Sequence, residues 1–342
     1  MIFLNFLLIT IIKLKRFLSN NHILESKALF ISNAGIGDTI YFLSAIQLYN
    51  QLTGVKADIL IPANSKDLLF KNEFLDNIYT INEKQKIDYK KYKYIFSNRT
   101  NFSILFEIIK SGFSYNFIEN PSYEKLRLIS RIRCFISQKY KKDFFSKFHA
   151  GLQFNYIIKD IFKSEIKLPK PLILSIKPEG IQINNFLEKN HTYGILHVAG
   201  QDEIRKLNPN LIFNISENIH YPIILVGSKY DLVFYENVNF NSNVYNGIGE
   251  FSLNEVLYLI EKSIFCIAPD SSIMHLAALT RTKLISLMGN ALEETFGPYF
   301  STNKIILSRK PNCSPCSKHV CRKFNGHSCV QDITLDEILY SI

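Results

Sequence analysis

The stretch CIAPDSSIMHLAALTRTKLISLMG, residues 266–289, has two apolar runs separated by a segment of small residues. The first run begins just before the stretch and covers 264–270, and the second covers 282–289. Both have the length and apolar content of buried strands. The small residues between them have the spacing of an apolar helix face. Strand, helix and strand in this order predict a parallel β-α-β unit with the helix on one face of a sheet.

Four polar residues lie where the first of these strands ends and the helix begins: Asp270, Ser271, Ser272 and His275. In open parallel sheets, ligands bind beyond the carboxyl ends of strands, where helix N-termini offer unpaired N–H groups to a phosphate. Asp270 could accept a hydrogen bond from a sugar hydroxyl, and His275 could donate one to a phosphate. Each residue alone fits a helix cap or a structural histidine equally well.

The alternation of strand and helix extends outward in both directions. Apolar runs at 192–200 and 221–227 precede the opening stretch, and similar runs at 28–31, 55–64 and 92–98 belong to an earlier half. Three prolines between residues 164 and 180 interrupt the pattern. We expect an extension at 1–26, a first α/β domain at 27–168, a linker at 169–182 and a second α/β domain at 183–342.

Composition limits the class of protein. The chain has 342 residues, of which 47% are hydrophobic, and a formal net charge of +10. Such apolar content excludes general disorder, and no apolar stretch reaches the length of a membrane-spanning helix. The positive charge predicts an anionic partner without naming it. We find no motif with a fixed groove-reading geometry and expect no nucleic-acid partner.

Two basic segments bear on that partner. An apolar run at the N-terminus is followed by Lys13, Lys15 and Arg16, the reverse of a secretory signal. It fits either a helix in a membrane interface or a helix packed on its own domain. Residues 125–147 contain eight Lys or Arg, including Lys139, Lys141 and Lys142, and fit either an anionic acceptor or a solvated helix face.

Charged residues that could bind a nucleotide sugar also follow other predicted strands. Arg205 and Lys206 follow one strand, where cations can neutralise a pyrophosphate leaving group, and Asp231 follows the next. In the first half, Asp38 follows Gly35 at the start of a helix and could be a general base in displacement at a sugar carbon, or a helix cap. The chain has no Walker pattern and no complete dinucleotide fingerprint, so a nucleotide-diphosphate pocket is the favoured interpretation.

These motifs together resemble glycosyltransferase family 9, the ADP-heptose:lipopolysaccharide heptosyltransferases of Gram-negative bacteria. The resemblance begins at residue 27 and rests on NAGIGDTIYFLSAI, HVAGQDEIRKLNP, LVGSKYD, APDSSIMHLAAL, LMGNALEETFGP and the cysteine tail. It implies a GT-B fold, in which two Rossmann-like domains with parallel sheets face a central cleft. It further implies inverting transfer of a heptose from ADP-heptose to the lipopolysaccharide or lipooligosaccharide inner core.

The resemblance also implies roles for individual residues. Asp38 matches the catalytic base. On the acceptor side we expect Gly37 and, from the basic stretch 125–147, Lys139, Lys141 and Lys142. The donor-binding set is Lys206, Asp231, Asp270, Ser271, Ser272 and His275. No cofactor is expected for catalysis, because the chain has no D-x-D pair for a metal-dependent transferase and Lys206 can supply the positive charge.

The expected partners are a nucleotide-sugar donor and a lipid-linked core oligosaccharide acceptor. Peripheral contact with the inner membrane and a place on its cytoplasmic face follow from the resemblance and from the basic segments. Six cysteines without an export signal fit a reducing compartment.

The tail contains Cys313, Cys316, Cys321 and Cys329. Four thiols in 17 residues can close a structural zinc site, although their spacing is not that of a standard finger. Similar cysteines recur in one branch of the family, so a tail without metal is the other interpretation.

Departures from the family pattern keep two alternatives open. Ser272 stands where the family usually has glycine, Leu43 and Ser44 replace its usual proline region, and the chain contains no tryptophan. The first alternative is a GT-B transferase that uses another nucleotide sugar in surface-glycan synthesis. The second, of a different class, is a zinc-stapled basic nucleic-acid-binding protein.

Overall fold

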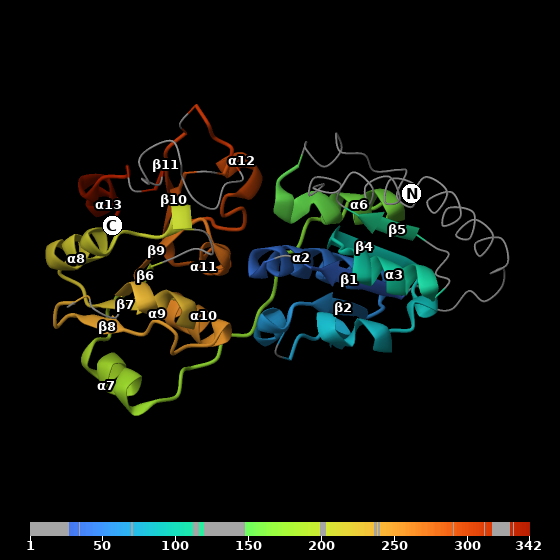
Figure 1. Cartoon of the computed structure of the whole chain (residues 1–342), viewed down its shortest axis with the longest axis horizontal. Coiled ribbons are helices and arrows are strands. Elements are labelled where there is room, and N and C mark those ends of the chain that lie inside the picture. Colours follow the sequence, from blue (N-terminus) through green and yellow to red (C-terminus); the bar gives the residue numbers. More distant parts are fainter. Residues whose placement is uncertain are drawn as a thin grey trace. The chain divides into compact units, whose positions relative to one another are not determined.

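The computed structural model describes residues 27–33, 35–69, 71–111, 116–119, 148–198, 203–235, 238, 240–289, 291–310, 312–316, 329–330 and 332–342. The chain divides into two compact units, Met1–Leu172 and Ile173–Ile342, and the division falls within residues 169–182 (Figure 1). Among the described residues, no helix is both long enough and apolar enough to cross a membrane.

The first unit is built on a parallel sheet with the strand order β3-β2-β1-β4-β5. Its strands are β1 (Ala28–Ser32), β2 (Ala57–Ile61), β3 (Leu75–Thr80), β4 (Tyr94–Arg99) and β5 (Asn116–Glu119). Its described helices are α2 (Ile36–Thr53), α3 (Phe102–Lys110) and α6 (Gln153–Phe162).

Packing on the central strand explains why this sheet forms. Every residue of β1 is buried, as expected of a strand covered on both faces. Phe30 of β1 meets Phe42 of α2 edge to face at 5.4 Å and stacks on Phe96 of β4 at 5.0 Å between ring centroids. Phe42 in turn contacts Phe154 of α6 at 4.7 Å, so α2 and α6 cover the same face of the sheet.

A β-bulge interrupts the pairing of β1 with β4 near their carboxyl ends. Ile31 is paired with Ser97, but the next residue, Ser32, is paired with Arg99. Asn98 is therefore the extra residue of β4. Bulges change the direction of a side chain and are common next to functional sites.

The second unit has a parallel sheet with the order β11-β10-β9-β6-β7-β8. Its strands are β6 (Gly194–His197), β7 (Ile223–Val226), β8 (Val244–Asn246), β9 (Phe265–Pro269), β10 (Lys283–Met288) and β11 (Lys304–Ser308). Its described helices are α7 (Ile181–Lys189), α8 (Pro209–Asn218), α9 (Leu232–Tyr235), α10 (Leu253–Lys262), α11 (Ser272–Ala277), α12 (Glu293–Phe296) and α13 (Leu335–Tyr340).

The two sheets share one topology. In each unit the chain starts at a central strand, extends the sheet to one side, and then returns to extend it on the other side. This order creates a switch point between β1 and β4 in the first unit and between β6 and β9 in the second, where open α/β sheets bind ligands. The predicted pair of parallel-sheet α/β domains is confirmed, and residues 265–288 form the predicted β9-α11-β10 unit.

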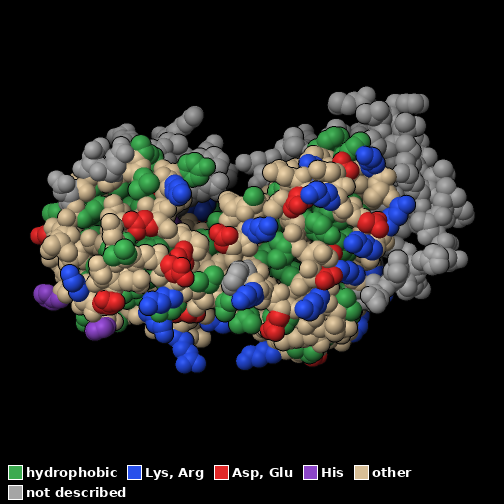
Figure 2. Space-filling view, turned by 90° about the horizontal axis from the view of Figure 1, so that it is seen from below, with side chains coloured by type: hydrophobic (Ala, Val, Ile, Leu, Met, Phe, Trp, Pro, Cys, Tyr) green, Lys and Arg blue, Asp and Glu red, His purple; other side chains and the backbone are tan. Residues whose placement is uncertain are grey.

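Charged side chains are mixed over the surface. On the face in Figure 2, Lys and Arg side chains lie among Asp and Glu on both units. The positive net charge is therefore not gathered into one continuous patch on the described part of that face, and this view singles out no binding surface.

Candidate active site

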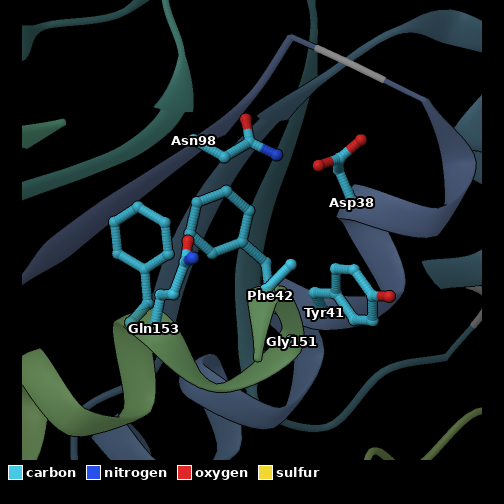
Figure 3. Close-up of a pocket in the computed structure, with 8 residues that line it drawn as sticks. Asp38, Tyr41, Phe42, Asn98, Gly151 and Gln153 are labelled. Carbon is cyan, nitrogen blue, oxygen red and sulfur yellow. The ribbon is translucent and has the colours of Figure 1, made fainter. Parts of the chain in front are cut away.

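A pocket opens at the β1/β4 switch point of the first unit (Figure 3). Residues of three origins line it. Asp38, Tyr41 and Phe42 come from α2, Asn98 comes from β4, and the rest come from the 3₁₀ turn Ala150–Leu152 and the start of α6: Ala150, Gly151, Gln153 and Phe154. Only Asp38 of these was predicted as a site residue from the sequence.

Asp38 lies in the first turn of α2 and is partly exposed. Its Oδ2 accepts a hydrogen bond from the Gly35 amide at 3.2 Å, and its own amide donates to the Gly35 carbonyl at 3.1 Å. A carboxylate in this position is favoured by the positive end of the helix dipole. Asp38 therefore takes part in the start of α2 and also lines the pocket, and its role as a base stays a prediction. Gly37 precedes it in the same turn.

The wall opposite α2 depends on a glycine. A Cβ atom on Gly151 would lie 2.6 Å from Tyr41 Cδ1, which is closer than real Cβ contacts allow. The turn is also fixed by His149, whose Nδ1 accepts a hydrogen bond from the Gly151 amide at 3.1 Å and whose ring meets Tyr41 edge to face. Gly151 therefore lets the 3₁₀ turn lie against α2 and close this side of the pocket.

Buried hydroxyl groups lie behind the pocket where β1 and β4 end. Ser32 and Thr39 share a hydrogen bond at 3.1 Å, and Ser97 and Thr100 share one at 2.7 Å. The amide nitrogen of Asn98 is 3.5 Å from Ser32 Oγ. These bonds join β1, α2 and β4 at the switch point.

A second polar cluster lies at the β6/β9 switch point of the other unit. Asp270 directly follows β9 and is buried. Arg205 Nη1 is 3.3 Å from Asp270 Oδ2 and 3.3 Å from the Asp270 carbonyl oxygen. Since Arg205 ends the 3₁₀ turn that follows β6, this ion pair joins the ends of two neighbouring strands. The sequence indicated Arg205 as a cation near phosphate but did not predict its pairing with Asp270.

The three other residues of the opening motif lie beside Asp270. Ser271 caps α11, and its Oγ accepts a hydrogen bond from the Met274 amide at 3.4 Å. Ser272 is the first residue of α11, and His275 is buried one turn later. The predicted junction of strand end and helix start is therefore present in the structure.

Lys206 and Asp231 have local partners. Lys206 Nζ lies 3.2 Å from the centroid of the Phe234 ring, a cation–π contact. Asp231 Oδ2 accepts hydrogen bonds from the Ser228 amide at 2.8 Å and the Ser228 hydroxyl at 2.6 Å, and the side chain is buried. Asp231 thus stabilises the turn that follows β7.

His197, the last residue of β6, was not identified from the sequence as a site residue. It is buried, and its Nδ1 lies 3.0 Å from the Val226 carbonyl oxygen. Burial lowers the pKa of His197 from 6.5 to about 4. The ring is therefore neutral near pH 7, and Nδ1 donates its proton to Val226.

Other predicted site residues lie partly outside the described residues. Lys139, Lys141, Lys142 and Cys321 fall in segments that are not described. Cys329 is buried against Gly289, where an added Cβ would lie 2.4 Å from the Cys329 Cβ. Within the described residues, which include Cys313 and Cys316, no three His, Cys, Asp or Glu residues are placed to hold a metal ion.

Comparison with known proteins gives the family. The family model described as glycosyltransferase family 9 (heptosyltransferase) matches residues 137–326. This range contains Lys206, Asp231, Asp270 and His275, whereas Asp38 precedes it. Comparison with curated proteins gave no match.

Several solved structures share the fold. A glycosyl transferase family 9 structure from Veillonella parvula DSM 2008 has a TM-score of 0.73 at 12% identity, and the match covers 94% of this chain and 98% of that one. The E. coli ADP-heptose lps heptosyltransferase II has a TM-score of 0.69 at 15% identity, with 92% and 97% covered. The E. coli heptosyltransferase WaaC with ADP has a TM-score of 0.61 at 12% identity, with 92% and 98% covered. Since the family model spans more than half of the sequence, the chain belongs to glycosyltransferase family 9 and is a glycosyltransferase.

Proposed function

We propose that this protein transfers a heptose from ADP-heptose to the inner core of lipopolysaccharide or lipooligosaccharide, with inversion at the anomeric carbon. The observation that carries the proposal is the pocket at the β1/β4 switch point, where a carboxylate at a helix start lines a space beside aromatic rings. Membership in the family supports the reaction class. Because the chain belongs to an enzyme family, we do not retain the nucleic-acid-binding alternative.

Asp38 performs the proton transfer in this proposal. Its carboxylate accepts the proton of an acceptor hydroxyl as the hydroxyl oxygen attacks the anomeric carbon of the donor. The bond between that carbon and the diphosphate oxygen breaks at the same time, and ADP leaves with the electron pair. One displacement of this kind inverts the anomeric configuration.

The β6/β9 switch point binds the donor. Arg205 provides a positive charge next to the start of α11 through its ion pair with Asp270, and Lys206 follows it in the chain. Such charges stabilise a departing diphosphate. Asp270 orients Arg205 through the ion pair at 3.3 Å. Lys206 must leave the Phe234 ring to reach a phosphate. Ser271, Ser272 and His275 complete the donor side, and a contact of Asp231 with the nucleoside stays a prediction, because the structure shows its carboxylate bound to Ser228.

The partners and the location are proposals on the same basis. Two similar structures contain the nucleotide or the whole donor: E. coli WaaC with ADP, and the iron-containing heptosyltransferase TibC with ADP-D-beta-D-heptose. We extend donor binding from them to this chain. A lipid-linked acceptor and contact with the cytoplasmic face of the inner membrane are proposed from the basic segments at 13–16 and 125–147. A structural zinc in the cysteine tail remains a proposal as well.

Calorimetric titration of the purified protein with ADP, UDP, GDP and CMP tests the donor assignment. We expect selective binding of ADP, and at least tenfold weaker ADP binding in Lys206→Ala. Lys262→Ala is a matched control, because its ammonium lies over the Tyr258 ring at 5.9 Å in the same unit. Preferred binding of another nucleotide would leave the family assignment in place and contradict ADP-heptose as the donor. Loss of ADP binding in Lys262→Ala as well would contradict the assignment of Lys206.

A further inference from the structure

Among the residues that line the pocket, Asn98 is the one that lies at the bulge in β4. Its neighbours Ser97 and Arg99 are both paired with β1, whereas Asn98 is the additional residue between them. Its side chain lines the pocket with Asp38. An amide is thus turned toward the space where the proposed reaction occurs.

The amide of Asn98 has an unfilled hydrogen-bonding capacity. The residue is only 5% exposed, and within the described part of the chain its Oδ1 has no hydrogen-bond partner. Its Nδ2 lies at the long distance of 3.5 Å from Ser32 Oγ. A buried amide oxygen without a donor costs free energy, and a ligand hydroxyl would remove that cost.

Figure 3 shows the nitrogen of the Asn98 side-chain amide on the side of the Asp38 carboxylate and the amide oxygen turned away from it, with the Phe42 ring beside them. A hydroxyl that attacks the donor gives its only proton to Asp38. The proton that Asn98 Oδ1 lacks must therefore come from a different hydroxyl. Two neighbouring hydroxyls of one sugar would satisfy both residues together.

We propose that Asn98 binds the acceptor by hydrogen-bonding a second hydroxyl, next to the one that Asp38 deprotonates. The pocket then recognises a sugar with two adjacent hydroxyls. This inference rests on the proposed function and adds a determinant of acceptor specificity to it.

The first test measures heptose transfer from ADP-heptose to a de-O-acylated, truncated lipooligosaccharide. Asn98→Ala should raise the acceptor KM about tenfold, as expected for one lost hydrogen bond, and leave ADP affinity unchanged. Asn155→Ala is the matched control. Asn155 is fully buried in the same unit, its Nδ2 donates to Ser44 at 2.9 Å, its Oδ1 also has no partner in the described residues, and it does not line the pocket.

Acceptors that lack single hydroxyls on the terminal sugar test the role of the second hydroxyl. One monodeoxy derivative should raise the acceptor KM of the unchanged protein about as much as Asn98→Ala does. The same derivative should cause no further rise in Asn98→Ala, because the two changes remove one interaction. Fully additive losses for every derivative would overturn the assignment to a second hydroxyl.

The pH dependence of kcat/KM distinguishes a role of Asn98 in the pocket from a merely structural role, which would leave it unchanged. Asn98→Asp places a second carboxylate opposite Asp38 and disfavours its ionisation, so the acidic limb of kcat/KM should move up by about one pH unit. Asn155→Asp should leave that limb in place. Thermal unfolding of each variant shows whether it is folded. If an Asn98 variant is not folded, Asn98→Ser is measured in its place.

The outcomes separate the two claims. If the unchanged protein transfers heptose and the folded Asn98 variants keep its acceptor KM and its acidic limb, the inference is wrong and the proposed function stands. If the unchanged protein binds ADP but transfers no heptose to the acceptor, the proposed function fails and the inference fails with it.

Discussion

Two turns in the molecule have the same hydrogen-bonding pattern, but their carboxylates lie in different surroundings. In the first unit the Gly35 amide donates to Asp38 three residues later, and in the second unit the Ser228 amide donates to Asp231. The capping residues have similar backbones, with φ −73° and ψ 173° at Gly35 and φ −83° and ψ 163° at Ser228. Both turns follow the carboxyl end of a parallel strand.

The capping residue makes the difference. Ser228 adds a hydroxyl bond of 2.6 Å to an amide bond of 2.8 Å, and Asp231 is buried. Gly35 has no hydroxyl, its amide bond is longer at 3.2 Å, and Asp38 stays partly exposed in a pocket. The comparison teaches that one local motif can either bury a carboxylate in the structure or place it partly exposed at a pocket, where the proposed function needs it.

The largest effect should come from removing each carboxylate charge. Asp38→Asn should lower kcat for heptose transfer about 10²–10⁴-fold with ADP affinity unchanged, because the amide cannot accept the proton. Asp231→Asn should keep most of kcat and lower stability instead, since a strong cap is lost. Steady-state kinetics with ADP titration would check both. Equal losses of kcat in the two variants would show that the turns do not differ in role.

The second effect concerns the buried histidine near Asp231. The pKa of His197 lies at about 4, below its ordinary 6.5. Between these two pH values the unfolded chain binds a proton at this histidine and the folded chain does not. The contribution of the neutral His197 to the free energy of unfolding should be fully present above pH 6.5. It should be lost as the pH falls from 6.5 to 4, and the total loss should be about 3 kcal/mol. His197→Asn keeps an N–H for the Val226 carbonyl and should flatten this part of the profile.

Urea unfolding between pH 7 and pH 4 is the measurement. The unchanged protein should lose more stability over this window than His197→Asn does. Identical slopes for the two proteins would contradict a buried, neutral histidine at the end of β6.

The third change converts one turn into the other. Gly35→Ser should place a hydroxyl within reach of Asp38 Oδ2, because an added Cβ would have only that oxygen within 4 Å, at 3.9 Å. The extra bond stabilises the ionised carboxylate and weakens it as a base, so kcat/KM should fall about tenfold and its acidic limb should move to lower pH. Gly35→Ala, which adds the Cβ without the hydroxyl, should keep the original limb. If serine and alanine behave alike, the hydroxyl is not the cause.

The smallest effect should follow from the reverse change. Ser228→Gly removes the 2.6 Å bond to Asp231 and should lower the free energy of unfolding by about 1 kcal/mol. Transfer activity should stay within twofold of the unchanged protein. Chemical denaturation beside the kinetic assay would check this, and a large loss of activity without a loss of stability would assign Asp231 a direct role at the donor.

Much of the fold followed from local patterns. Continuous apolar runs such as 28–31 and 264–270 predicted buried parallel strands, and the residues after them predicted the positions of Asp38 and Asp270. The edge strands of both sheets, β3, β5, β8 and β11, were missed. LDNIYT in β3 mixes polar and apolar residues, and β5 and β8 have only four and three residues. The identity of the edge strands depends on pairing with their neighbours, which no local pattern specifies.

The candidate site was predictable only in part, for a similar reason. Gly151 meets α2 from a position more than 100 residues later, and Arg205 meets Asp270 across 65 residues. The direction of Asn98 depends on a register shift between β1 and β4. Such contacts arise from tertiary packing, so the sequence indicated the chemistry at each strand end but not the partners that orient it.

The most direct test is proton NMR of the product formed from ADP-β-heptose and a truncated lipooligosaccharide acceptor. If Asp38 is the base in a single displacement, the new glycosidic bond has the α configuration, opposite to that of the donor. A product with the β configuration would require a second displacement and would contradict the role assigned to Asp38.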